Sequence, residues 1–170
     1  MRVLGLAGWS GSGKTTLVVK LIPALVAHGL RVSTIKHAHH EFDVDQPGKD
    51  SYRHRAAGAA EVLVASSRRW ALMHEHRGGE EPSLDVLLAK LEAADLVLVE
   101  GFRRDIHAKI EIRRSDTEKP WLAPDDPHIV AIATDLIDEA VRFGRPVLPI
   151  EDAEAIAAFV VGHMDLWERP

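Results

Sequence analysis

The stretch GWSGSGKT, residues 8–15, fits the pattern G-x-x-x-x-G-K-[ST] at every position. The apolar run Arg2–Ala7 before it predicts a buried strand, and residues 14–28 after it predict a helix with leucines along one face. Glycines allow the backbone turns that point successive N–H groups inward, and the helix that follows adds its positive N-terminal end. This order of strand, glycine-rich loop and helix predicts a site for the phosphates of a nucleotide.

The rest of the chain alternates short apolar runs with helical patterns, which is typical of an α/β fold. We predict a three-layer P-loop NTPase fold with a mostly parallel central sheet, formed as one domain over residues 1–170. The runs 61–65 and 70–74 flank the segment SSRR and predict a β-hairpin extension. Lys109–Arg113 alternates like a half-exposed strand, and Asp152 is expected to cap the last helix.

Composition narrows the class of protein further. The formal net charge is −5, so no overall field attracts nucleic acid or an anionic membrane, and we expect neither as a partner. The absence of cysteine excludes disulfides and cysteine-ligated metal sites, and it fits a reducing compartment. No window approaches the roughly 18–20 apolar residues that span a bilayer, and the first residues lack the pattern of a signal peptide. We therefore expect a cytoplasmic protein.

Catalysis at such a loop needs a cation at the phosphates and a metal site. The ammonium group of Lys14 can reach the β- and γ-phosphates, and the hydroxyl of Thr15 can ligate Mg²⁺. Glu100 directly follows the buried run DLVLV, and ligands gather at the carboxyl ends of parallel strands, so Glu100 is the expected acidic half of the Mg²⁺ site. The alternative is an ordinary acid that faces solvent. Asp95 begins the same run and is interpreted as structural.

The polar stretch 37–49 is predicted to form a surface loop, where functional groups tend to lie. Among its acids, Asp45 is the candidate catalytic residue, either to orient water or to complete the Mg²⁺ shell. Asp50 is expected to cap a short helix that follows. The same stretch holds three histidines that could bind a transition metal, although their spacing is no firm metal signature and a solvated loop is the plain alternative. These histidines are His37, His39 and His40.

The candidate residue for base recognition is Asp135. An aspartate can accept hydrogen bonds from both N1–H and N2–H of guanine. The chain has no N-K-x-D string, but Ala-Thr-Asp at 133–135 directly follows the buried run 129–133, which places Asp135 like such a residue. A turn or helix-cap aspartate is an equal alternative. Composition and spacing do not distinguish GTP from ATP.

Taken together, these stretches resemble the molybdopterin-guanine dinucleotide biosynthesis protein B (MobB) family nearly from end to end. The longest matching string, IKHAHHEFDVDQPGKDSYRHRAAGA at 35–59, is far more specific than the phosphate loop, which many unrelated families share. The other matching strings are GLAGWSGSGKTTL, VASSRRWALM at 64–73, LVLVEGF at 96–102, AKIEI at 108–112 and HIVAIATD at 128–135.

The resemblance implies a GTP-binding protein that uses Mg²⁺, hydrolyses GTP weakly and forms homodimers, with a hairpin around 62–75 in the dimer contact. It also implies work beside the guanylyltransferase that joins GMP to molybdopterin, with molybdopterin or its guanine dinucleotide as a further ligand. Thr15 and Glu100 would lie at Mg²⁺. The residues implied to bind phosphate are Gly11, Ser12, Gly13, Lys14, Thr15 and Thr16.

Weak hydrolysis has a physical account in the sequence. The loop has no second lysine before Lys14, and no obvious glutamine stands ready to position water, so Mg²⁺ and positioning would be the main catalytic contributions. Basic residues are candidates to meet the pterin phosphate or the partner enzyme, although surface solubility is the better explanation for any one of them. These residues are Arg68, Arg69, Arg103, Arg104 and Lys109.

Two other functions remain open from the sequence. A small-molecule kinase would use the same loop but needs a lid with arginines, for which only Arg113 and Arg114 stand near the proline-rich segment 114–127. A metallochaperone GTPase would load a metal such as nickel through the histidine-rich loop. Transfer of the γ-phosphate to an acceptor other than water would indicate the kinase, and metal binding lost on replacing His39 and His40 would indicate the metallochaperone.

Overall fold

The structure is a computed structural model that describes residues 1–38 and 42–167. By their internal contacts, the described residues fall into two compact units. The first, here called the sheet unit, comprises Met1–His37 and Leu87–Pro170, and the second, the hairpin unit, comprises Ala38–Val86. That both belong to one domain stays a prediction. Among the described residues, no helix is both long enough and apolar enough to cross a membrane.

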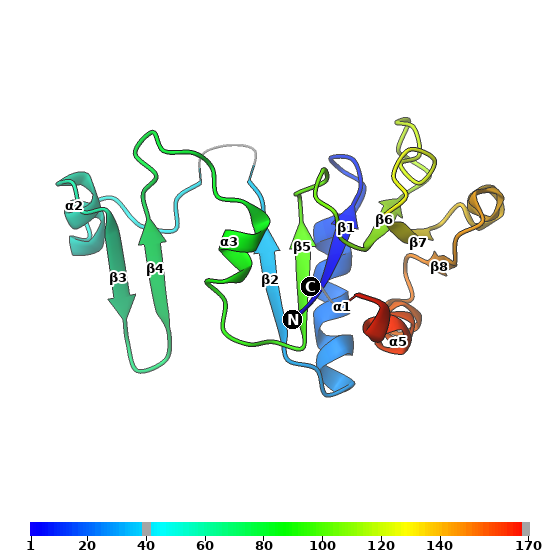
Figure 1. Cartoon of the computed structure of the whole chain (residues 1–170), viewed down its shortest axis with the longest axis horizontal. Helices are drawn as coiled ribbons and strands as arrows, with labels where there is room; N and C mark the ends of the chain where they lie inside the picture. The colour runs from blue at the N-terminus through cyan, green and yellow to red at the C-terminus, as the bar shows by residue number, and fades with distance from the viewer. Residues whose placement is uncertain (39–41, 168–170) are drawn as a thin grey trace. The chain divides into compact units, whose positions relative to one another are not determined.

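The elements follow the alternation that the sequence predicts (Figure 1). In the first half of the chain they are β1 (Arg2–Ala7), α1 (Lys14–Ala27), β2 (Val32–Lys36), α2 (Asp50–Ala56), β3 (Glu61–Ala65), β4 (Trp70–His74) and α3 (Leu84–Leu88). In the second half they are β5 (Leu96–Glu100), β6 (Lys109–Arg113), β7 (Ile129–Thr134), α4 (Ile137–Ala140), β8 (Val147–Pro149) and α5 (Ala153–His163), with 3-10 turns η1 (Val141–Phe143) and η2 (Met164–Trp167).

The sheet unit is built on a parallel sheet, as predicted. In the described part of the chain this sheet has six strands in the order β2-β5-β1-β6-β7-β8, and each neighbouring pair is parallel. Because β1 lies between β5 and β6, the loop after β1 opens at the edge where those two strands also end. The register pairs Leu6 with Glu100 and Ala7 with Glu111. The topology therefore brings residues from three strand ends around the loop Gly8–Thr15, here called the phosphate loop.

One face of the sheet is covered by α1 and α5, which pack against each other (Figure 1). The predicted leucine stripe of α1 is confirmed, because Leu17, Leu21 and Leu25 are at most 2% exposed. The predicted cap of α5 is also confirmed, since the Asp152 carboxylate accepts a hydrogen bond from the N–H of Ala155 at 2.9 Å. This apolar layer anchors α1, whose first residue is Lys14.

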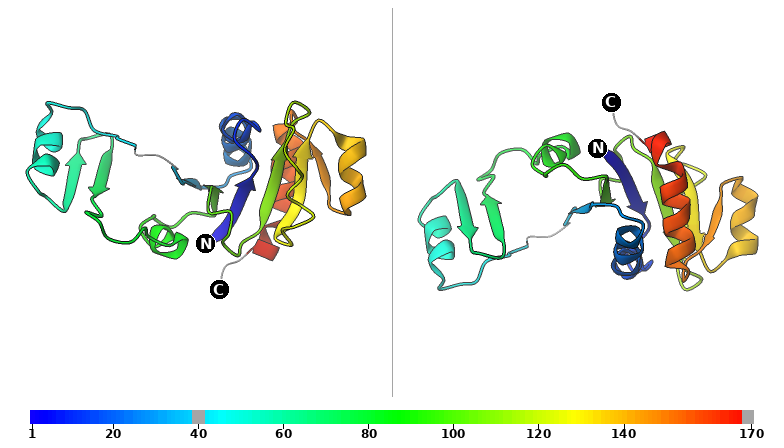
Figure 2. Two further views of the ribbon diagram at one scale, coloured as in Figure 1. Left: turned by 90° about the horizontal axis from the view of Figure 1, so that it is seen from above. Right: turned by 90° about the horizontal axis from the view of Figure 1, so that it is seen from below.

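The opposite face carries a second core under the proline-rich segment. Trp121, Leu122 and Ala123 pack with Ile129 and Ile132 of β7. The helix α4 packs against β7 and β8, and Figure 2 shows it at the β8 edge of the sheet. The segment predicted as a loop thus supplies a layer of the fold without regular secondary structure.

Two predictions about single elements are wrong. β6 is not half-exposed: Lys109, Ile110, Glu111 and Ile112 are all at most 2% exposed, because β6 lies inside the sheet between β1 and β7. Its alternation separates an apolar face from a buried polar one, on which Lys109 Nζ binds Asp126 Oδ2 at 3.0 Å. Asp50 is not the cap of α2, because that position belongs to Lys49 and Asp50 lies in the first turn.

The hairpin unit contains the predicted β-hairpin. Its strands β3 and β4 form an antiparallel two-stranded sheet within the described residues, with Leu63 opposite Leu72 and Ala65 opposite Trp70. The helix α2 packs against β3, where Val62 is buried. The other face of the hairpin is apolar and is not covered by packing: its residues Leu63, Leu72 and Trp70 are 60%, 42% and 58% exposed.

Candidate nucleotide-binding site

The phosphate loop adopts backbone conformations that require its glycines. Gly11 and Gly13 have φ angles of +83° and +89°, a region in which side chains are strained. A Cβ on Gly8 would lie 2.5 Å from both the carbonyl oxygen of Ile112 and the Oγ of Ser12. The loop is further closed by the N–H of Ser12, which donates to the carbonyl of Trp9 at 3.1 Å. Sequence and geometry therefore agree on a tight turn directly before α1.

Lys14 folds back over this loop. Its Nζ donates to the carbonyl oxygens of Gly8 and Trp9, each at 2.8 Å. Burial lowers the pKa of the Lys14 ammonium from its usual value, the charge of Glu100 opposes that shift, and the charge of Lys36 adds to it. Phosphate oxygens are stronger acceptors than carbonyls, so a bound polyphosphate would take over these hydrogen bonds and favour the charged lysine.

The two residues predicted at the metal lie close together. Thr15 Oγ1 is 3.4 Å from Glu100 Oε2, because Glu100 ends β5 beside β1 while Thr15 lies in the first turn of α1. Neighbouring ligands in an octahedral Mg²⁺ shell stand about 3 Å apart, so this hydroxyl and carboxylate fit two adjacent positions. Mg²⁺ held there would neutralise charge on the β- and γ-phosphates. Thr16, the last predicted phosphate ligand, is exposed in the same turn.

Asp135 lies just past the end of β7, at the same edge of the sheet. Its two carboxylate oxygens accept hydrogen bonds from the N–H and the hydroxyl of Ser115, at 2.8 and 2.9 Å. The following helix α4 has Leu136 at its N-cap, so Asp135 is held by the segment after β6 and precedes the helix cap. Each carboxylate oxygen keeps a further lone pair, and the side chain is exposed, so it can still accept from a base.

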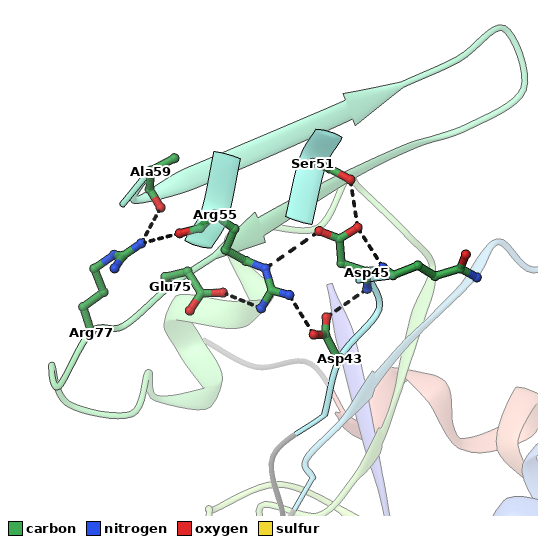
Figure 3. A network of polar contacts seen from close by, with 8 residues as sticks. Asp43, Asp45, Ser51, Arg55, Ala59, Glu75 and Arg77 are labelled. Atoms are coloured by element: carbon green, nitrogen blue, oxygen red, sulfur yellow. Dashed lines mark hydrogen bonds and ion pairs between the residues drawn. The ribbon is translucent and has the colours of Figure 1, made fainter. Parts of the chain in front are cut away.

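Asp45 belongs to a polar network within the hairpin unit (Figure 3). Its Oδ1 accepts hydrogen bonds from the hydroxyl of Ser51 at 2.8 Å and from the N–H of Gln46 at 3.0 Å. Its side chain is 6% exposed, and Arg55 Nε lies 3.8 Å from Oδ2. These contacts fix the carboxylate onto α2, and a catalytic role for Asp45 stays a prediction.

Arg55 is the centre of that network. It donates to Asp43 at 2.7 Å and to Glu75 at 3.1 Å, and so ties the loop before α2 to the end of the hairpin (Figure 3). The N–H of Asp45, followed by Arg55, holds the pKa of the Asp43 carboxyl below its usual value. The network therefore holds Asp43 and Asp45, two acids of the loop that the sequence predicts to be functional.

The histidine-rich loop is described only in part. The N–H of His37 donates to the carbonyl of Glu100 at 2.8 Å, and its ring lies 5.0 Å from that of Phe102. His39 and His40, the other two residues of the suggested transition-metal site, lie outside the described residues. Within the described ranges, no group of three or more histidine or acidic residues is arranged to hold a metal ion.

A cavity of about 650 Å³ lies in the sheet unit, next to the phosphate loop. Trp9 contributes to it from the loop itself, and its indole N–H donates to the carbonyl of Pro120 at 2.8 Å. The guanidinium of Arg103 lies 4.8 Å from the Trp9 ring centre. The remaining lining residues are Arg104, Lys109, Pro120, Trp121, Leu122, Asp125, Asp126 and His128. The lining thus combines indole rings with charges of both signs.

One residue beside the phosphate loop is suggested by the sequence only as part of a kinase lid. Arg114 directly follows β6, and its Nε lies 2.7 Å from where a Cβ of Gly13 would be. The signal was available, because the rule that selected Glu100 and Asp135 from strand ends applies equally to Arg114. Interpreting β6 as half-exposed concealed its place inside the sheet.

Comparison with known proteins gives the chain its family. The model of the family described as "Molybdopterin guanine dinucleotide synthesis protein B" matches residues 3–135. The chain belongs to this family. Two adapter proteins of molybdopterin-guanine dinucleotide biosynthesis are similar to it over nearly their whole length. The Escherichia coli protein is 47% identical, with 95% of this chain and 93% of that protein covered, and the Haemophilus influenzae protein is 43% identical, with 93% and 86% covered.

A solved structure of the MobB family agrees with the fold. The crystal structure of a molybdopterin-guanine biosynthesis protein B superposes with a TM-score of 0.73 at 28% sequence identity, and it covers 96% of this chain and 99% of that one. The predicted α/β class with a mostly parallel sheet is therefore confirmed, as is the resemblance noted from the sequence. The family favours an adapter over the small-molecule kinase and the metallochaperone.

Proposed function

We propose that this MobB-family chain is a GTP-binding adapter of molybdenum cofactor biosynthesis, which assists a guanylyltransferase in attaching GMP to molybdopterin. One arrangement carries this proposal: Lys14, Glu100 and Asp135 lie along the same edge of the sheet, at which a loop shaped by glycines opens. The first two suit a triphosphate with Mg²⁺, and the third suits the N–H groups of guanine. The names of the relatives supply the pathway.

We propose that hydrolysis of GTP is weak and depends on Mg²⁺. Thr15 and Glu100 would hold the ion, and Lys14 would stabilise charge on the transferred phosphoryl group. No residue of the phosphate loop offers a base for the attacking water, which is in keeping with slow hydrolysis. We place the protein in the cytoplasm, in keeping with a sequence without cysteine.

Guanine recognition is tested by Asp135→Asn. An asparagine presents one acceptor and one donor, which match the N1–H and the C2 carbonyl of xanthine in place of the two donors of guanine. We expect affinity for GTP to fall about 10- to 100-fold, since a matched acceptor is replaced by a donor that faces a donor. Affinity for xanthosine triphosphate should rise over the same range, as measured by calorimetry.

The matched control for this exchange is Asp138→Asn, an exposed aspartate in the first turn of α4. It should bind GTP and xanthosine triphosphate as the unmodified chain does. If Asp135→Asn kept the preference for GTP, the base would be recognised elsewhere, and Asp135 would serve only to hold Ser115.

We further propose that molybdopterin, or its guanine dinucleotide, binds in the cavity beside the phosphate loop. Molybdopterin carries a fused ring system and a phosphate, so it suits a site with aromatic surfaces and cations. The cavity offers the rings of Trp9 and Trp121 and the guanidinium groups of Arg103 and Arg104. Trp9 also belongs to the phosphate loop, where its carbonyl accepts from Lys14, so the two ligands would share one residue.

We propose that the chain forms a homodimer through the uncovered face of the hairpin. Leu63, Leu72 and Trp70 form a contiguous apolar surface there, and a second copy would bury it against the same surface. The double change Leu63→Asp and Leu72→Asp is expected to convert the dimer to a monomer of 18.7 kDa in sedimentation equilibrium. The reason is that charges would be buried without partners in the interface.

The control for the dimer is Val141→Asp, which changes a valine of the sheet unit that is 57% exposed. This variant should stay dimeric. A hairpin variant that keeps the dimer mass would place the interface on another surface, and an unmodified chain that is monomeric at micromolar concentration would remove the dimer proposal.

A further inference from the structure

Arg114 occupies a place at the phosphate loop that the proposed function does not yet use. It follows β6 directly, and its side chain lies against the backbone of Gly13, with Nε 2.7 Å and Cζ 3.7 Å from the position of a Cβ there. Gly13 is the residue directly before Lys14, and its φ of +89° turns the loop into α1. A guanidinium group therefore lies beside the point where the phosphate loop enters α1.

One ion pair holds this guanidinium in place, and its acidic partner is itself held by a lysine. Its Nη2 donates to Glu151 Oε1 at 2.6 Å, and Glu151 Oε2 accepts from Lys20 Nζ at 2.6 Å. Glu151 thus links the segment after β6 to α1, the helix that begins at the phosphate loop. Lys20, followed by Arg114, holds the pKa of the Glu151 carboxyl below its usual value, so the bridge is charged at neutral pH. The Arg114 side chain is 25% exposed, which leaves it open to a ligand.

Its sequence neighbours have other partners. Arg113 lies over the ring of Trp121 at 4.4 Å and donates to the carbonyl of Thr117, while Ser115 donates to Asp135. Within the described part of the chain, Glu151 is the polar partner assigned to the Arg114 side chain. A guanidinium has five N–H donors, so most of them remain available beside Gly13.

The direction of a bound nucleotide follows from the same geometry. Lys14 and the Thr15–Glu100 pair lie on the β5 side of the loop entrance, and Asp135 lies on the β7 side, beyond the end of β6. A nucleotide that reaches from one to the other passes the end of β6 with its α- and β-phosphates. Arg114 directly follows β6 and therefore lies beside this path of the phosphates.

We propose that Arg114 is a nucleotide-positioning residue that donates hydrogen bonds to the α- and β-phosphates, oriented for this by Glu151. The inference rests on the proposed binding of GTP. A cation at this end of the polyphosphate contacts ground state and transition state alike, so it increases affinity without accelerating hydrolysis. This assignment fits a protein that holds GTP but cleaves it slowly.

The test compares Arg114→Ala and Arg114→Lys with the control Arg142→Ala, an exposed arginine whose contact is the ring of Phe143. Affinities for GTP and for GDP are measured by calorimetry with Mg²⁺, together with steady-state hydrolysis. We expect Arg114→Ala to weaken GTP and GDP by the same factor, about 10- to 100-fold, with an increase in KM and an unchanged kcat. Arg114→Lys should recover part of the affinity, because it keeps the charge without the planar fork.

Three other results of these measurements would contradict either the role of Arg114 or the proposed function. A loss of affinity for GTP but not for GDP would indicate that Arg114 contacts the γ-phosphate, and it would overturn the contact proposed here. Arg114→Ala that binds both nucleotides like Arg142→Ala would overturn the inference and leave GTP binding intact. An unmodified chain that binds neither nucleotide would instead overturn the proposed function. Thermal unfolding of the nucleotide-free variants shows whether a loss of affinity is structural. Arg114 would have a purely structural role if Arg114→Ala lowered the unfolding midpoint and Arg114→Lys restored the midpoint but not the affinity.

Discussion

Lys14→Ala is expected to weaken the binding of GTP by at least about thirtyfold, because removing one partner of a desolvated charge pair costs about 2–5 kcal/mol. The lysine is the one cation within the phosphate loop, and in the free protein it is held by the carbonyls of Gly8 and Trp9. Titration calorimetry with GTP measures the loss, and Lys90→Ala, which removes an exposed lysine of the same unit, should leave the affinity unchanged.

The same lysine gives GTP affinity a dependence on pH. Burial lowers the Lys14 pKa below its usual 10.5, and bound phosphates favour the charged form. Affinity should therefore decrease as the pH rises through this lowered pKa, earlier than for an ordinary lysine. Unchanged affinity in Lys14→Ala, or an affinity that increases in alkaline solution, would contradict a direct contact between this ammonium and the phosphates.

The second large effect concerns stability. Glu111 is 1% exposed, and its two carboxylate oxygens accept hydrogen bonds from the N–H groups of Leu122 and Ala123, each at 2.8 Å. Glu111→Ala leaves both N–H groups buried without acceptors, so we expect the free energy of unfolding to fall by about 2–4 kcal/mol. Urea unfolding followed by circular dichroism measures this change. Glu118→Ala, an exposed acid of the same segment, should stay within about 0.5 kcal/mol of the unmodified chain.

The pKa of Glu111 determines how this effect varies with pH. Burial raises that pKa above the ordinary value of 4.5, although the two N–H groups oppose the shift, so the folded state binds this proton more tightly than the unfolded state. The stabilisation by Glu111 is then complete below about pH 4.5 and decreases as the pH rises through the folded-state pKa. Glu111→Ala should accordingly cost more at about pH 5 than at about pH 8. A cost that grows with pH would show that the carboxylate, and not the acid, is the favoured form.

Much of the fold follows from local patterns in the sequence. The strand Arg2–Ala7, the leucine stripe of α1 and the capped helix α5 each combine hydrophobic periodicity with an end signal, and each is found where it was expected. The burial of β6 was predicted wrongly. Alternation of apolar and polar residues shows that a strand has two different faces, but it does not show that the polar face is exposed to water. A buried polar face needs partners distant in sequence, such as Asp126 for Lys109, and no local pattern contains them. The short elements α4 and β8 carry too few residues for periodicity to identify them.

The candidate site was predictable where a residue adjoins a clear strand end. Glu100 follows an apolar run and lies 3.4 Å from Thr15, and Asp135 follows another. Arg114 obeys the same rule, but its strand was taken for a half-exposed one. Asp45 was chosen from a loop without a strand to position it, and its partners Ser51 and Arg55 become evident only in three dimensions.

Guanine-nucleotide binding is tested most directly by a calorimetric titration of the unmodified chain with GTP and with ATP, each with and without Mg²⁺, followed by molybdopterin. We predict saturable binding of one GTP per chain that is strengthened by Mg²⁺, weaker binding of ATP, and binding of molybdopterin to the GTP-loaded chain. Equal or stronger binding of ATP would contradict guanine recognition at Asp135, and no binding of either nucleotide would contradict a phosphate site at Gly8–Thr15.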